Sequence, residues 1–213
     1  MRTRTGRAVA AMAGLLMLSG CLPGIGIGKG QRPAGPDDPV RDPVNERWYT
    51  PSDLIDGTEK IREQFPDLEV ESGMSLAGTF TEPDDRELIP AQDDYWRQSV
   101  MVVGEEAVAE LVAASRVAAA SDGGGVDPLT GEGTSPMNSP AGTRADDEVI
   151  RGVIVQPLED EAGQCPDGWI LLGMTLTADP TDTIRPVTAD GLVITMAAVC
   201  EGGDRIVVDA RDF

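Results

Sequence analysis

The stretch that decides the fold is LVITMAAVCEGGDRIVVDA, residues 192–210. It holds two apolar runs, 192–200 and 205–210, and the glycine pair Gly202-Gly203 lies between them. Two short runs rich in Val and Ile around a glycine-containing turn are typical of a β-hairpin. The sequence therefore predicts two neighbouring antiparallel strands here.

Four further segments upstream of this hairpin are predicted to be strands. The alternation is clearest in the last of them, where Ile170, Leu172, Met174 and Leu176 fall on one face. The four segments are 68–82, 95–103, 148–156 and 169–177. Turn residues, including Asp190-Gly191, separate the C-terminal strands.

One long helix is predicted over Glu105–Ala120. Val108, Leu111, Val112 and Ser115 recur at the spacing of one helix face, and Glu105 begins a first turn that favours negative charge. That face is small and apolar, which indicates packing against the sheet. A shorter helical region is predicted from Thr50 to Phe65, with Thr50 as N-cap, Pro51 at the first helical position and Gly57 as a possible break.

Together these elements predict a single α+β domain over residues 48–213. Its antiparallel sheet is expected to have about five or six strands, with the 105–120 helix packed on it. Residues 122–147 are poor in apolar side chains and rich in Gly, Ser, Thr and Pro. We expect them to form a long, mobile, disordered loop within the domain.

The first 20 residues have the layout of a secretory signal peptide. Arginines at positions 2, 4 and 7 precede an uncharged apolar run, 8–18, which is too short to span a bilayer as a helix. The run ends in Leu18-Ser19-Gly20-Cys21, which resembles the lipobox of bacterial lipoproteins. The resemblance implies cleavage between Gly20 and Cys21 and acylation of the Cys21 thiol. The alternative is an ordinary signal peptide with an incidental cysteine.

Residues 21–47 are predicted to be a lipidated tether, because they are dense in Gly and Pro and have no helix or strand period. The glycine-rich run 24–30 superficially suggests a phosphate-binding loop. Pro23 replaces the first glycine of that motif, and Gly30 replaces the Ser or Thr after Lys29. No nucleotide site is therefore expected.

Cysteine and histidine content restricts the chemistry further. Besides Cys21 the chain has only Cys165 and Cys200, and an exported domain meets oxidising conditions, so a disulfide between these two is predicted. A redox-active or metal-binding pair is the alternative, but the spacing is not CxxC. The chain has no histidine, which excludes histidine-based general bases, catalytic triads and zinc sites.

The charge balance argues against nucleic acid as a partner. There are 17 Lys and Arg against 37 Asp and Glu, a net charge of −20, and loss of the three leader arginines would make the charge more negative still. Nucleic-acid binding depends on neutralising phosphates with basic residues. A solvated acidic surface is expected, and a cation-binding surface is the alternative. The many arginines, alanines and glycines, with only two lysines, are typical of a high-GC bacterium such as an actinobacterium.

Candidate binding residues are few. Carboxylates occur as neighbours in 84–85, 93–94, 146–147 and 159–161, whereas acid–base catalysis needs two opposed across a cleft. Asp179 and Asp182 are weak calcium candidates, without the alternating oxygen ligands that calcium prefers. Exposed aromatic residues would favour carbohydrate or peptide binding, and Tyr95-Trp96 beside the acidic pair 93–94 is the first cluster to inspect.

The sequence thus predicts a non-catalytic binding or accessory lipoprotein on the extracytoplasmic face of the cell membrane. Its expected partners are the membrane, through the lipid anchor, and an envelope protein; no cofactor or metal is predicted. The alternative is a cell-envelope hydrolase that uses carboxylates and requires a buried acid with a raised pKa beside a second one.

Overall fold

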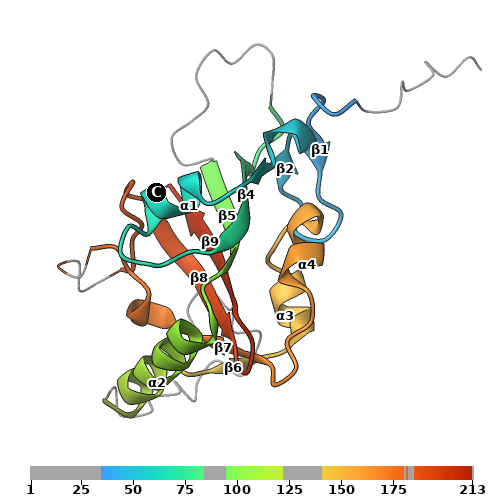
Figure 1. Cartoon of the computed structure of the whole chain (residues 1–213). Helices are drawn as coiled ribbons and strands as arrows, with labels where there is room; N and C mark the ends of the chain where they lie inside the picture. Colours follow the sequence, from blue (N-terminus) through green and yellow to red (C-terminus); the bar gives the residue numbers. More distant parts are fainter. Residues whose placement is uncertain (1–34, 84–94, 122–140, 180, 182–184, 213) are drawn as a thin grey trace, which may run out of the picture. The chain divides into compact units, whose positions relative to one another are not determined.

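The 192–210 hairpin lies at the centre of a large antiparallel sheet in the computed structural model (Figure 1). The structure describes residues 35–83, 95–121, 141–179, 181 and 185–212. Within these ranges nine strands join in the order β1-β2-β4-β5-β9-β8-β7-β6, with β3 paired to β4 outside that path. The strands are β1 (Val40–Arg41), β2 (Trp48–Tyr49), β3 (Ile55–Asp56), β4 (Ser72–Thr79), β5 (Tyr95–Val102), β6 (Arg144–Ala145), β7 (Trp169–Leu171), β8 (Val193–Cys200) and β9 (Arg205–Arg211).

Helices cover both faces of this sheet. On one side Val108 and Val112 of α2 (Glu105–Ser121) and Ile61 of α1 (Glu59–Gln64) belong to the same buried cluster as Ile206 and Val208 of β9. On the other side α3 (Asp147–Arg151) and α4 (Gln156–Ala162) cover a second cluster, and Figure 1 shows them across the sheet from α2. Because both faces are buried, residues 206–210 of β9 are all inaccessible to solvent.

The prediction of an α+β domain with an antiparallel sheet is confirmed, but the expected five or six strands were too few. The additional strands are mostly pairs of residues, such as β1, β2, β3 and β6. A strand of two residues has no detectable period, so only its partner defines it.

The predicted strand at 148–156 is wrong, because α3 and the start of α4 occupy it. Asp146 caps α3 by accepting a hydrogen bond from the Val149 backbone N–H at 2.9 Å, and Pro157 lies in the first turn of α4. Ile150, Ile154 and Leu158, four residues apart, are buried on the same side. A spacing of four residues places side chains on one face of a helix and also on one face of a strand, so burial alone did not separate the two.

The predicted strand at 169–177 is shorter than expected. β7 ends at Leu171, and a 3₁₀ helix follows at Gly173–Thr175. Gly173 has φ 51°, and a Cβ there would lie 3.0 Å from the Ala141 backbone nitrogen. Glycine adopts this left-handed conformation readily and leaves room for the Ala141 backbone, so the chain can turn out of the sheet at this position. The region from Thr50 to Phe65 also divides, into a 3₁₀ helix (Pro51–Asp53), β3 and α1.

Two predicted boundaries also change. The tether was expected to reach residue 47, but β1 pairs with β2 in the register Val40 to Tyr49, so residues 40–47 belong to the folded unit. Of the predicted loop 122–147, residues 122–140 lie outside the described part of the chain. Its end is structured, since β6 pairs with β7 and α3 begins at Asp147.

Candidate functional site

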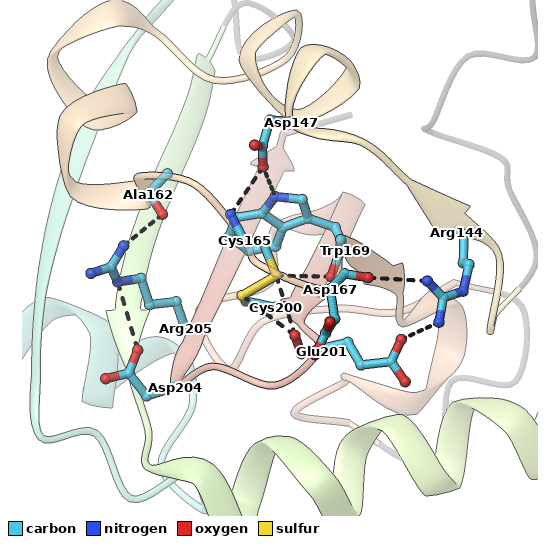
Figure 2. Close-up of a disulfide and its surroundings, with 11 residues drawn as sticks. Arg144, Asp147, Ala162, Cys165, Asp167, Trp169, Cys200, Glu201, Asp204 and Arg205 are labelled. Atoms are coloured by element: carbon cyan, nitrogen blue, oxygen red, sulfur yellow. Dashed lines mark hydrogen bonds and ion pairs between the residues drawn. A yellow bond between two sulfur atoms is a disulfide. The ribbon is translucent and has the colours of Figure 1, made fainter.

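The predicted disulfide is present between Cys165 and Cys200, with an S–S distance of 2.09 Å and a Cα–Cα distance of 5.4 Å (Figure 2). It joins the loop before β7 to the end of β8, where Trp169 lies opposite Cys200. Both cysteines are buried. The bridge therefore fixes neighbouring strand ends.

A carboxylate beside the disulfide has a structural role. Asp147 Oδ1 accepts hydrogen bonds from the Cys165 backbone nitrogen at 3.2 Å and from the Trp169 indole Nε1 at 2.8 Å (Figure 2). Its neighbour Asp146 caps α3. The acidic pair 146–147 thus supplies two different structural acceptors, and its two members do not form a catalytic dyad.

Glu201 joins three elements at the tip of the β8–β9 hairpin. It accepts hydrogen bonds from Arg116 of α2 and, at 2.5 Å, from Arg144 of β6. Arg144 also donates to the Asp167 carbonyl at 3.0 Å (Figure 2). Arg116 and Glu201 also line a cavity of about 400 Å³, together with Glu105, small and apolar residues of α2, and Gly202 and Gly203.

The least expected feature is an ion pair inside the domain. Arg47 Nη1 and Nη2 donate to the two carboxylate oxygens of Asp209, the second at 3.0 Å, and the side chains are 5% and 0% exposed. Gln98 Nε2 donates to Asp209 Oδ1 at 2.8 Å, and the Thr195 hydroxyl donates to Oδ2 at 2.5 Å. Both carboxylate oxygens of Asp209 are therefore occupied by internal donors.

Neighbouring backbone and aromatic groups surround the buried Arg47–Asp209 ion pair. A bulge in β8 between Ile194 and Met196 accompanies the hydrogen bonds of Thr195 to Asp209. The Arg47 guanidinium lies 5.3 Å from the ring centres of both Phe80 and Trp96, within the range of cation–π contacts. Sequence reasoning missed this site. A signal was available, because Asp209 interrupts an apolar strand and a buried carboxylate needs a partner.

Arg47 is held in place by a turn that begins at Asp42. Asp42 Oδ1 accepts from the backbone nitrogens of Val44 and Asn45, and Oδ2 accepts from Gln156 N at the start of α4. The Asn45 amide donates to two carbonyls of the α3–α4 connection, at 3.1 and 3.0 Å. The segment before β2 is thereby fastened to the helices on this side of the sheet.

The remaining predicted acidic sites do not converge in the described structure. Burial raises the pKa of Glu159 on α4, the Asp42 and Asp160 carboxylates raise it further, and Arg151 opposes them. Asp179 Oδ1 accepts from Thr181 N and Oγ1 at 2.9 and 2.6 Å. Asp182 and the pairs 84–85 and 93–94 fall outside the described ranges. Among the residues that are described, no three acidic or cysteine side chains are grouped to hold a metal ion.

The aromatic cluster chosen from the sequence is divided by the fold. Trp96 is 1% exposed and donates its indole N–H to the Thr79 carbonyl at 2.9 Å, while Tyr95 is 42% exposed. Trp48, by contrast, is partly exposed and lines a cavity of about 460 Å³. The aromatic side chains at this cavity are Trp48 and Phe80.

Searches of protein-family models, of curated proteins and of solved structures gave no match to this chain. No helix within the described ranges is long and apolar enough to cross a membrane. Gly20 and Cys21, the predicted cleavage and lipidation residues, precede the first described residue.

Proposed function

We propose that this protein is a lipid-anchored extracytoplasmic domain of a bacterial cell envelope that binds a ligand or partner without catalysing a reaction. The observation that carries the proposal is the pairing of Cys165 with Cys200. Because the sequence has three cysteines, this pairing leaves no other cysteine of the chain to bond with Cys21 at the lipobox position. A stable anchor is expected from two or more acyl chains at the mature N-terminus.

The occupancy of the inner carboxylates favours binding over hydrolysis. Asp209 is saturated by Arg47, Gln98 and Thr195, and Asp42 accepts from three backbone nitrogens. A general acid or base needs an oxygen that can reach substrate. Glu159 has a raised pKa beside Asp42, but Asp42 is committed to its turn.

Metabolic labelling with a palmitate analogue tests the anchor. Cells expressing the full chain are labelled, and the N-terminal peptide of the mature protein is weighed by mass spectrometry. We expect acylated Cys21 and partition of the protein into detergent. Cys21→Ala should abolish both, whereas the matched double variant Cys165→Ser/Cys200→Ser should keep the label. An unlabelled wild-type chain released into the medium would refute the proposal.

A further inference from the structure

The cavity at the turn between β1 and β2 has mixed walls. It has a volume of about 460 Å³, which lies in the usual range for small-ligand sites. Its lining residues are Arg41, Asn45, Glu46, Trp48, Phe80 and Glu82. The amide of Asn45 is already committed to the α3–α4 connection. The groups available to a ligand are therefore two aromatic rings, two carboxylates and a guanidinium.

The two aromatic rings differ in freedom. Phe80 is held by guanidinium groups, with Arg47 at 5.3 Å and Arg211 at 4.5 Å from the ring centre. Trp48 is partly exposed, and no acceptor for its indole N–H is found in the described structure, whereas Trp96 donates to a backbone carbonyl. Trp48 thus offers a ligand an apolar ring face and a hydrogen-bond donor.

The charges around the cavity have both signs. Arg41 Nη2 lies 2.8 Å from Glu46 Oε1, and the two side chains remain 52% and 70% exposed. Glu82 adds a second exposed carboxylate. A site for a simple cation or anion would favour one sign. Interspersed donors and acceptors instead suit a neutral ligand whose groups both donate and accept, as hydroxyls do.

Glu46 is an unusual residue for its backbone position. Its φ is 62°, the one described non-glycine residue in the left-handed region. Glycine adopts this conformation more readily, and the turn's hydrogen bond from Glu46 N to Asp42 O would be kept by glycine. The backbone therefore does not require a glutamate, whereas the Glu46 carboxylate pairs with Arg41 and lines the cavity. Backbone strain of this kind clusters at ligand sites.

We infer that this cavity binds a pyranose ring of a carbohydrate, which deepens the proposed binding function and rests on it. The apolar face of the sugar stacks on Trp48. Its hydroxyls donate to the Glu46 and Glu82 carboxylates and accept from Arg41 and from the indole N–H.

Saturation-transfer NMR with maltotriose, mannotriose and chitotriose tests this inference. The full chain is used in a detergent without a sugar head group, and affinity is measured by isothermal titration calorimetry, which does not depend on Trp48 as a fluorophore. We expect transfer to the ring protons of at least one sugar. Trp48→Ala should raise the Kd for that sugar at least about tenfold, because the stacking contact with the ring is lost. Tyr95→Ala, which removes an exposed aromatic outside the cavity, should leave the Kd unchanged.

Glu46→Gly separates a binding role from a structural one. We expect Kd to rise severalfold while Tm stays level or increases, because glycine relieves the backbone. Absence of transfer to all three sugars, or wild-type Kd in both Trp48→Ala and Glu46→Gly, would overturn the inference. Binding of cationic peptides in place of sugars would also overturn it. The palmitate experiment is read separately, so a failed anchor and a failed sugar site are distinguishable.

Discussion

Replacing Arg47 by methionine should destabilise the domain strongly, because it leaves the Asp209 carboxylate buried without its main counter-charge. Removing one member of a buried ion pair costs about 3–5 kcal/mol. Arg211 Nε lies 3.7 Å from Asp209 Oδ2 and compensates in part, so we expect the lower end, about 3 kcal/mol. In a domain of this size that loss corresponds to a fall in Tm of roughly 6–12 °C.

Urea unfolding followed by tryptophan fluorescence measures this loss, and Arg97→Met is the matched control. Arg97 pairs with Asp190 at 2.7 Å, but the side chains are 31% and 38% exposed, so the expected cost is below about 1 kcal/mol. The double variant Arg47→Met/Asp209→Leu should recover part of the loss, since the buried carboxylate is removed together with Arg47. Equal midpoints for Arg47→Met and Arg97→Met would refute the reasoning.

Three other changes probe the remaining structure. Cys165→Ser/Cys200→Ser should lower the free energy of unfolding by about 3–4 kcal/mol, measured in urea, since the bridge closes a loop of sequence separation 35; an unchanged midpoint would contradict this. Asp147→Ala should cost about 1–3 kcal/mol by leaving two donors unpaired, and a red-shifted tryptophan emission should accompany the loss. Glu159→Gln should raise Tm at pH 7, because the raised pKa makes the ionised form unfavourable in the folded state. The wild-type protein gains stability as pH falls through the pKa of Glu159, so the difference in Tm between Glu159→Gln and wild type should vanish below about pH 4. Glu161→Gln is the control. A higher Tm of Glu159→Gln that persists at low pH would exclude the raised pKa as the cause.

The long strands and the long helix were predictable because each carries its own period. β4, β5, β8, β9 and α2 were predicted with small boundary differences. The segment 148–156 was misread because Val149, Ile150, Val153 and Ile154 are compatible with either a short buried strand or a helix. The Asp146 cap decides between them, and it was taken for one half of an acidic pair.

Whether a candidate site could be predicted depended on how far apart its residues lie in the sequence. The disulfide followed from counting cysteines, since only one pairing was left after Cys21. Arg47 and Asp209 are 162 positions apart, and no local pattern joins them. Trp48 was predicted to begin the domain, but its cavity depends on the turn before it, which was placed in the tether. Composition indicated which residue types were available for a site, whereas the sites themselves are formed by contacts between residues that are distant in sequence.

The position of β9 makes completion of the sheet depend on the last described strand in the sequence. β9 is the last described strand in sequence, yet it lies between β5 and β8 and is the only link between them in the strand order. Until residues 205–211 are available, no strand joins β5 to β8, and the two parts of the sheet are not linked by strand pairing. The buried ion pair likewise forms only when Asp209 of β9 is in place beside Arg47. Pairing between strands that are distant in sequence slows folding in general, so we expect completion of this sheet to be a slow step.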